Sequence, residues 1–431
     1  MNLSEMATRA REAFYALSTA KVDQRNLALL KMAEQLEKDQ DAIFAANQQD
    51  CEQALQEGLA APLLARLNFD HSKLKQVQEG LLSLRDLPDP IGETVFCHEL
   101  TEGLKLYRVT CPIGVIGVIF ESRPDALIQI SSLAIKSGNA ALLKGGREAL
   151  RTNQALIQSV QTALTQAGLP GDAAQLMESR EDVAAMLKED ELIDLIIPRG
   201  SNAFVRYIMD NSRIPVLGHA DGICHVYVDQ DADLDIAFQV ALDSKVQNLS
   251  VCNAEETLLV HEAIAERFLP TFAQLLQERG VEIRGDEATR QLIACKAATE
   301  KDWFTEYLDT ILSIRIVSSL DAAIQHINHY GSHHTDCIIT ENDASAAVFL
   351  NQVDSAGVYR NVSTRFADGF VYGLGAEVGI ATGKLHSRGP MGLDGLTTYK
   401  YKLIGHGHTM TEMKSGLRKY THRVLDEKCP L

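Results

Sequence analysis

Apolar and polar positions divide the chain into a helical first part and a longer part in which short apolar runs alternate with helices. Residues 3–58 predict helix, because side chains such as Leu27 and Leu30 recur at helical spacing among charged neighbours. Residues 87–92 contain two prolines and a glycine and break this pattern. Apolar and polar positions then alternate from Leu104 onward, which predicts an extended arm within residues 95–112.

From residue 114 the pattern predicts buried strands separated by helices. The expected strands cover residues 114–120, 140–143, 192–197, 224–228, 256–260, 314–317, 337–340 and 356–359. The clearest helices cover residues 125–137 and 147–167. Alternation of strand and helix predicts parallel sheets with right-handed crossovers. We therefore expect two α/β domains in series, with a boundary near residue 230, followed by a glycine-rich C-terminal return.

Composition and charge narrow the class of protein. The chain has 431 residues and a formal net charge of −17, which argues against a general nucleic-acid binder but leaves small anionic substrates open. Its eight cysteines contain no CxxC pair, which is typical of a reducing compartment. The longest apolar stretch, residues 112–120, is too short for a bilayer span, and the N-terminus shows no apolar signal core. A soluble cytoplasmic protein is the expectation.

Several familiar motifs are absent from the sequence. Residues 373–379 place their glycines at the wrong spacing for a dinucleotide fingerprint, and Val378 stands where a phosphate-binding loop needs glycine. Four histidines lie close together at positions 326, 329, 333 and 334. No carboxylate or cysteine stands at a recognised ligand spacing beside them, so we expect no metal site there.

Cys252 is the candidate nucleophile. It lies in a loop of polar and small residues directly before an apolar strand, where a thiol can be exposed and activated. From the pattern alone a free cysteine is more often inert, and both interpretations stay open at this point.

A resemblance to a known family is carried by ten segments in a fixed order. They are Val-Ile-Phe-Glu-Ser-Arg-Pro at 118–124, Lys-Ser-Gly-Asn-Ala at 136–140, Leu-Lys-Gly-Gly-Arg at 143–147, Pro-Arg-Gly-Ser at 198–201, Cys-His-Val-Tyr-Val-Asp at 224–229, Val-Cys-Asn-Ala at 251–254, His-Ile-Asn-His-Tyr-Gly-Ser at 326–332, Asn-Val-Ser-Thr-Arg-Phe at 361–366, Gly-Leu-Gly-Ala-Glu at 373–377 and Lys-Leu-His-Ser-Arg-Gly-Pro-Met at 384–391. With these segments the chain resembles the aldehyde dehydrogenase superfamily, and within it the branch that reduces an acyl phosphate to an aldehyde.

The resemblance implies an α/β, aldehyde dehydrogenase-like fold with two doubly wound parallel-sheet domains plus an oligomerisation arm. It places an NADP-binding domain at residues 1–228, with 95–112 as part of the arm. A catalytic domain follows at 229–372, and a return segment and oligomerisation tail at 373–431.

The resemblance also implies a reaction, the NADPH-dependent reduction of L-glutamyl 5-phosphate to L-glutamate 5-semialdehyde. Cys252 falls on the superfamily nucleophile, and Asn253 is the expected amide donor to the oxyanion. Relatives that hydrolyse their thioester carry a glutamate base where this chain has Val-Leu-Gly-His-Ala at 216–220, without a carboxylate. The usual asparagine of the oxyanion hole aligns near Ser122 or Arg123, so the donors of that hole stay open.

Cofactor residues follow from the same resemblance. Lys144 matches a lysine that contacts the adenosine ribose, and Arg147 stands where NAD-preferring relatives have an acid, which favours NADP. A helix-capping role for Arg147 is the alternative. Glu306 matches the glutamate that holds the nicotinamide ribose. The remaining expected cofactor contacts are Pro198, Gly200 and Ser201.

An anionic substrate suits three arginines at the ends of apolar runs, Arg123, Arg199 and Arg365. For each of them an ordinary ion pair is an equal alternative. Two alternatives for the activity also stay open, namely another semialdehyde dehydrogenase of the superfamily and a catalytically inactive relative.

Assembly is the last expectation. The arm and a late strand at 397–404 match segments that pair between subunits, which predicts a homodimer or a dimer of dimers with Tyr399, Tyr401 and Leu403 on one face. A hairpin that covers its own edge is the alternative. An association with glutamate 5-kinase, the upstream enzyme, is a hypothesis of the resemblance alone.

Overall fold

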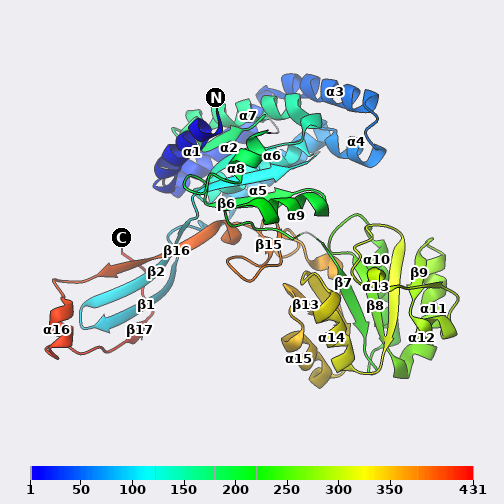
Figure 1. Cartoon of the computed structure of the whole chain (residues 1–431). Coiled ribbons are helices and arrows are strands. Elements are labelled where there is room, and N and C mark those ends of the chain that lie inside the picture. The colour runs from blue at the N-terminus through cyan, green and yellow to red at the C-terminus, as the bar shows by residue number, and fades with distance from the viewer. Residues whose placement is uncertain (1, 122, 179–180, 220, 376, 431) are drawn as a thin grey trace. The chain divides into compact units, whose positions relative to one another are not determined.

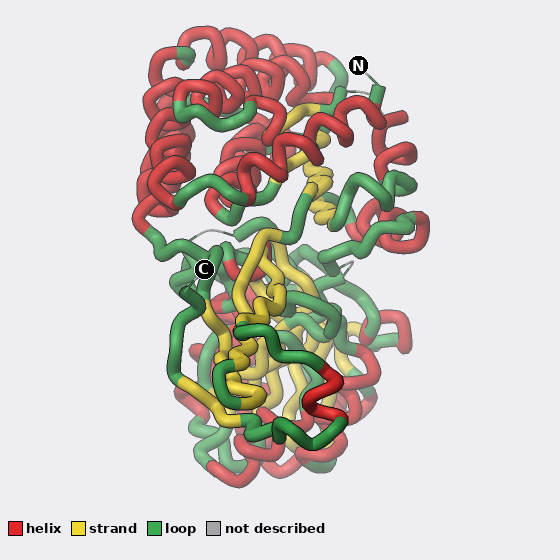
Figure 2. The backbone as a smooth tube through the Cα atoms, turned by 90° about the vertical axis from the view of Figure 1, so that its left-hand side faces the viewer, coloured by secondary structure: helices red, strands yellow, loops and turns green. Residues whose placement is uncertain are grey.

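The computed structural model describes residues 2–121, 123–178, 181–219, 221–375 and 377–430 (Figure 1). The chain divides into two compact units. The first unit contains Met1–Leu217, Leu374–Gly379 and Met391–Leu431, and the second contains Gly218–Gly373 and Ile380–Pro390. In both units the backbone trace shows strands flanked by helices (Figure 2).

The first unit begins with five helices, where the apolar periodicity predicted a helical region. They are α1 (Leu3–Ser18), α2 (Val22–Lys38), α3 (Gln40–Gln56), α4 (Ala61–Leu67) and α5 (His71–Asp86). Asn2 and Glu5 close the first turn of α1 as a capping box. The break expected at residues 87–92 lies between α5 and the first strand.

A four-stranded parallel sheet forms the core of this unit, in the order β5-β4-β3-β6. Its elements in chain order are β3 (Val115–Phe120), α6 (Pro124–Lys136), β4 (Ala140–Lys144), η1 (Arg147–Ala149), α7 (Leu150–Gln166), η2 (Gly171–Ala173), β5 (Ala174–Leu176), α8 (Glu181–Met186), β6 (Leu195–Arg199) and α9 (Asn202–Asn211). Every residue of β3 and β4 is buried, as expected for strands covered on both faces. Leu3, Ala7 and Ala10 of α1 pack on one face of this sheet.

A separate antiparallel sheet forms the arm, in the order β16-β2-β1-β17 (Figure 1). Its strands are β1 (Thr94–Thr101), β2 (Leu104–Pro112), β16 (Thr397–Ile404) and β17 (Arg423–Leu425), with α16 (Met410–Lys414) between the last two. The tail after residue 404 therefore returns to the arm. There β17 pairs with β1, and Arg423 forms an ion pair with Glu99.

The second unit is built on a seven-stranded parallel sheet in the order β10-β9-β11-β8-β7-β12-β13. Its elements are β7 (Cys224–Val228), α10 (Leu234–Val246), β8 (Glu255–His261), α11 (Glu262–Gln277), β9 (Glu282–Gly285), α12 (Glu287–Leu292), β10 (Lys296–Ala297), α13 (Glu300–Trp303), β11 (Ile311–Val317), α14 (Leu320–Tyr330), β12 (Thr335–Ile339), α15 (Asp343–Gln352), β13 (Gly357–Arg360) and η3 (Thr364–Phe366). Helices α10 and α11 cover one face, and α14 and α15 cover the other.

The chain then forms a short two-stranded sheet from β14 (Gly379–Ala381) and β15 (Gly389–Met391), and η4 (Asp394–Leu396) precedes the late arm strand. Among the described helices, none has the length together with the apolar composition that crossing a membrane requires.

Candidate active site

Cys252 lies in a tight turn directly before β8, half-buried in the second unit. The N–H of Ala254 donates to the carbonyl oxygen of Val251 at 3.1 Å and closes this turn. Gly222 packs against the turn so closely that a Cβ atom there would lie 2.6 Å from the Cα atom of Cys252. The position of the Cys252 thiol therefore depends on the absence of a side chain at Gly222.

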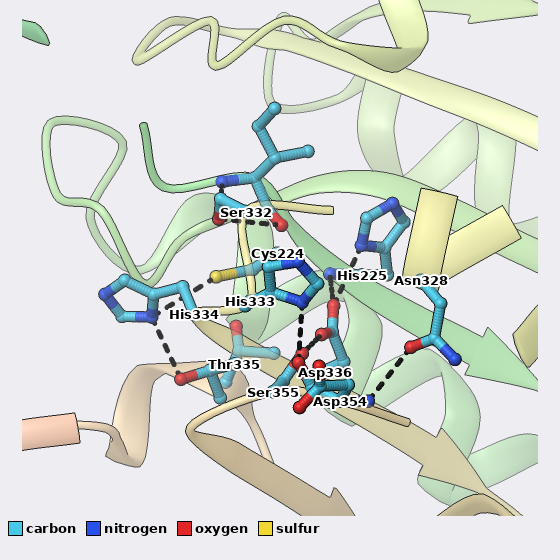
Figure 3. Close-up of polar contacts among 12 residues, drawn as sticks. Cys224, His225, Asn328, Ser332, His333, His334, Thr335, Asp336, Asp354 and Ser355 are labelled. Carbon is cyan, nitrogen blue, oxygen red and sulfur yellow. Dashed lines mark hydrogen bonds and ion pairs between the residues drawn. The ribbon is translucent and has the colours of Figure 1, made fainter. Parts of the chain in front are cut away.

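His334 directly precedes β12, and its Nε2 atom lies 3.2 Å from the Sγ atom of Cys252. On the other side of the ring, Nδ1 lies 3.0 Å from Oγ1 of Thr335 and 3.7 Å from Sγ of Cys224 (Figure 3). Only 1% of His334 is exposed, and burial lowers the pKa of its imidazole well below the ordinary value. The ring is therefore neutral near pH 7, and it can accept a hydrogen bond from the thiol.

The loop of Cys252 is fastened to η3 by two hydrogen bonds. Oγ1 of Thr364 donates to the backbone oxygen of Asn253 at 2.7 Å. Nδ2 of Asn253 donates to the backbone oxygen of Ala367 at 3.0 Å. The side chain of Asn253 thus holds the segment that contains Arg365, and its expected role as oxyanion donor stays a prediction.

Arg365 places a cation beside the nucleophile. Its Nε atom donates to Oε1 of Gln247 at 2.9 Å. Burial lowers the pKa of Arg365, and the nearby Cys252 thiolate opposes this effect. A guanidinium at this position can pair with an anionic group of a substrate.

A buried ion pair supports the loop that contains Glu306. Nζ of Lys245 donates to Oε2 of Glu256 at 2.6 Å, with both side chains fully buried. Burial raises the pKa of Glu256 to about 7, although Lys245 acts in the opposite direction. Oε1 of Glu256 accepts the backbone N–H of Leu308 at 3.0 Å, which anchors the chain two residues after Glu306.

In the first unit, the expected cofactor residues lie at the carboxyl ends of two strands of the parallel sheet, β4 and β6, which are separated by β3. Lys144 ends β4, is 8% exposed, and donates from Nζ to the backbone oxygen of Gly145 at 2.7 Å. Gly200 and Ser201 follow β6, in which Pro198 is the penultimate residue. The N–H of Ser201 donates to Oε2 of Glu121 at 3.3 Å. The carboxyl edge of a parallel α/β sheet is where such folds bind their ligands.

Arg147 is exposed in η1, close along the chain to Lys144. Across the described ranges, no acidic side chain forms an ion pair with its guanidinium. The residue is therefore a cation available to an anionic ligand.

The other two expected substrate arginines also lie in the first unit. Arg123 is the residue before α6, and its Nη2 atom lies 3.1 Å from Oδ2 of the buried Asp125. This ion pair matches the structural alternative, and a role toward substrate stays a prediction. Arg199 ends β6. Ser122 lies outside the described residues.

The four clustered histidines do not share one helix. Helix α14 ends at Tyr330, so it contains His326 and His329 but neither of the other two. Nδ1 of His326 accepts from Arg315 at 2.9 Å. Nδ1 of His333 donates to the backbone oxygen of Asp354 at 2.6 Å (Figure 3). His334 alone among them contacts Cys252. The sequence analysis missed this role, since its only signal was a histidine before an apolar strand.

Comparisons with known proteins place the chain in a family. The profile of the aldehyde dehydrogenase family matches residues 1–310. The gamma-glutamyl phosphate reductase of Pelotomaculum thermopropionicum is 55% identical over 427 residues, which cover 99% of this chain and 98% of that protein. The enzyme of the same name from Acetivibrio thermocellus is 54% identical over 431 residues, 100% of both chains.

A solved structure agrees with these sequence relationships. The crystal structure of gamma-glutamyl phosphate reductase from Thermotoga maritima has a TM-score of 0.93 and 40% sequence identity, and the match covers 95% of this chain and 100% of that one. The expected aldehyde dehydrogenase-like α/β fold is thereby confirmed. The chain belongs to the γ-glutamyl phosphate reductase family, within the aldehyde dehydrogenase superfamily.

Proposed function

We propose that Cys252 is the residue through which the chain carries out the reaction of its family as a covalent thioester. The reaction is the NADPH-dependent reduction of L-glutamyl 5-phosphate to L-glutamate 5-semialdehyde, the second step of proline biosynthesis from glutamate. The observation that carries the proposal is the 3.2 Å contact between Sγ of Cys252 and Nε2 of His334. A thiol beside a neutral imidazole is a nucleophile with an adjacent proton acceptor.

The first chemical step follows from this contact. Sγ attacks the acyl carbon, its proton moves to Nε2 of His334, and the bond between that carbon and the phosphate oxygen breaks. The proton then passes from His334 to the departing phosphate. Because burial disfavours the imidazolium form of His334, the ring gives the proton up readily. The product of this step is the thioester on Cys252.

When bound, NADPH supplies the hydride that reduces the acyl group. After reduction the bond between Sγ and the carbon breaks, the aldehyde leaves, and Sγ regains one proton from solvent through His334. A positioned base promotes loss of the thioester to water, and the stretch that matches the glutamate motif of hydrolytic relatives, residues 216–220, contains no carboxylate. The missing carboxylate supports a reductive cycle.

The residues at the carboxyl edge of the first unit fit NADPH by their chemistry. Lys144 and Arg147 present two cations three residues apart, which suits a ribose with a 2′-phosphate. A Cβ atom at Gly200 would lie 2.8 Å from the carboxylate of Glu121, so the chain after β6 approaches the end of β3 closely. Glu306 in the second unit is the proposed partner of the nicotinamide ribose.

Substrate binding is proposed for Arg365, with Arg123 and Arg199 as further cations. The substrate has a phosphate and an α-carboxylate, and guanidinium groups bind both with paired hydrogen bonds. Arg365 has the strongest support, because the Cys252 thiolate is close enough to raise the pKa of its guanidinium against the effect of burial.

Assembly as a homodimer or a dimer of dimers is also proposed. In the arm β16 pairs with β2 on one side, and within the described residues no strand covers its other side. The exposed rings of Tyr399 and Tyr401 have centroids 5.7 Å apart on one face, and Leu403 is 56% exposed. A partner would cover this edge. Sedimentation at micromolar concentration tests the proposal, and a fully active monomer would contradict it. Contact with glutamate 5-kinase and a cytoplasmic location stay predictions.

The reverse reaction tests the proposed function. Glutamate semialdehyde should reduce NADP beyond the first turnover only in the presence of inorganic phosphate, because phosphate must release the acyl group from Cys252. Reduction of NADP at an equal rate without phosphate would point to hydrolysis instead and would refute the acyl phosphate assignment.

A further inference from the structure

The surroundings of Cys252 contain a second imidazole besides that of His334. One ligand atom each from His219, Cys252 and His334 lie within 4.8 Å of one another. The two histidine rings stand edge to face, with centroids 5.0 Å apart. The three residues come from three separate segments of the second unit, before β7, before β8 and before β12. A thiol and two imidazoles thus converge in this part of the second unit.

Both rings form a polar contact through Nδ1. Nδ1 of His219 lies 3.0 Å from the backbone oxygen of Ile380, and a carbonyl oxygen can only accept. In the neutral form of this ring, Nδ1 therefore has the proton and Nε2 has the lone pair. In His334, Nδ1 contacts the hydroxyl of Thr335 while Nε2 faces Cys252. A histidine that binds a metal through one ring nitrogen usually donates the N–H of its second ring nitrogen to a carbonyl or a similar group.

We propose that Cys252, His219 and His334 form a binding site for Zn²⁺ and that the bound ion blocks the catalytic thiol. Zinc prefers one or more thiolates with imidazoles in a tetrahedral arrangement, and three protein ligands leave the fourth position to water. On binding, the bond between Sγ and its proton breaks, the proton goes to solvent, and a bond between Sγ and zinc forms. No electron is transferred, so the inhibition is reversible by a chelator.

The geometry requires a small adjustment. Bonds of about 2.0 Å to nitrogen and about 2.3 Å to sulfur put tetrahedral ligand atoms roughly 3.5 Å apart. The ligand atoms of His219, Cys252 and His334 lie within 4.8 Å of one another, so the largest separation allowed exceeds this value. The 3.2 Å between Sγ of Cys252 and Nε2 of His334 is already short enough. His219 is only half-buried, in contrast to His334, so rotation of the His219 side chain is the movement that completes the site. Mg²⁺ should not bind, because it prefers oxygen ligands.

The proposal rests on the proposed function only for the claim of inhibition, since metal binding is measured without turnover. The full-length protein is titrated with ZnCl₂ by calorimetry, and with CoCl₂ by absorption spectroscopy as a coloured substitute for zinc. We expect one Zn²⁺ per chain, no binding of Mg²⁺, and a cobalt spectrum with a thiolate-to-metal band that is missing in Cys252→Ala. Absence of that band from the wild-type spectrum would overturn the proposal.

His219→Ala is the decisive variant, because His219 has no part in the proposed chemistry. It should keep basal turnover and bind Zn²⁺ about tenfold or more weakly. His329→Ala, which removes a histidine outside the site, should bind Zn²⁺ as the wild type does. Equal zinc affinity in His219→Ala and wild type would refute the site. If wild type binds the metal with the thiolate band and Cys252→Ala is fully active, the metal site is confirmed and the catalytic assignment of Cys252 is refuted.

Discussion

His334 and Cys252, which are 82 residues apart in the sequence, meet with Nε2 and Sγ at 3.2 Å. The contact joins the residue before β12 to the turn before β8. Both residues therefore lie at the amino-terminal edge of the same parallel sheet. It connects the nucleophile with a neutral, buried proton acceptor. The proposed chemistry depends on this contact more than on any other in the second unit.

Replacing His334 by glutamine should lower kcat by about 100-fold or more, since proton transfer by a positioned side chain contributes this much. KM should change little, because the ring touches the nucleophile and binds no substrate group in the proposed mechanism. Steady-state kinetics of phosphate-dependent NADP reduction measures both values. His329→Gln is the matched control and should behave as the wild type. A kcat within a factor of two of the wild type, a difference well below the loss expected here, would remove His334 from the mechanism.

Gly222→Ala should displace the nucleophile. The new Cβ atom would lie 2.6 Å from Cα of Cys252 and 2.2 Å from its backbone oxygen, so the turn must move. We expect kcat to fall about tenfold or more, because small displacements of reacting groups are costly. Gly383→Ala is the control, since a Cβ atom there meets nothing within 4 Å. Unchanged kinetics in Gly222→Ala would mean that Cys252 tolerates movement of its turn.

Arg147→Glu should change the cofactor preference. The exposed guanidinium is the proposed partner of the 2′-phosphate, and a hydrogen bond to a charged group contributes about 1.5–3 kcal/mol. The ratio of kcat/KM for NADP to that for NAD should therefore fall by about one to two orders of magnitude. If the ratio stays the same, another residue recognises the phosphate and Arg147 only caps its helix.

Glu255→Met should stabilise the fold. Glu255 is fully buried in β8, and within the described residues neither carboxylate oxygen has a hydrogen-bond partner. Removing such a group gains about 1–3 kcal/mol of unfolding free energy. Thermal unfolding of the variant and of the wild type measures this gain, with the exposed Glu266→Met as control.

The same substitution has a pH dependence with a definite sign. Burial raises the pKa of Glu255 well above its ordinary value, so the folded chain keeps this carboxyl neutral. Glu255 destabilises the folded protein least at a pH below its pKa in the unfolded chain, where the carboxyl is neutral in both states. Stability is lost as the pH rises from that value toward the folded-state pKa, because only the unfolded chain then ionises freely. The stability advantage of Glu255→Met should therefore grow as the pH rises above 4.5, the ordinary pKa of a glutamate carboxyl. An advantage that shrinks over this range would show that Glu255 is ionised in the folded protein.

Much of the fold could be predicted because buried parallel strands have a simple signature. Residues 224–228 were predicted as a strand and form β7, and 140–143 form most of β4. The helix expected over 147–167 begins as the short 3₁₀ turn η1 before α7. These elements follow from apolar runs and helical periodicity, which are local properties of the chain.

The candidate site could be predicted only where a residue type is informative by itself. Cys252 stood out through its motif, whereas His334 was grouped with three neighbours in the sequence. Tertiary structure separates that group, since α14 ends at Tyr330 and the next segment turns His334 toward Cys252 in the turn before β8. The use of the Asn253 side chain to hold the segment of Arg365 likewise depends on two distant loops meeting. No spacing along the chain contains such information.

Trapping the covalent intermediate tests the central claim most directly. The protein is mixed with glutamate semialdehyde and NADP without phosphate, and the reaction is stopped with acid within the first turnover. The account predicts a burst of about one NADPH per active chain, a γ-glutamyl group on the peptide that contains Cys252, and neither in Cys252→Ala. A burst that persists in Cys252→Ala, or an acyl group attached to another residue, would contradict it.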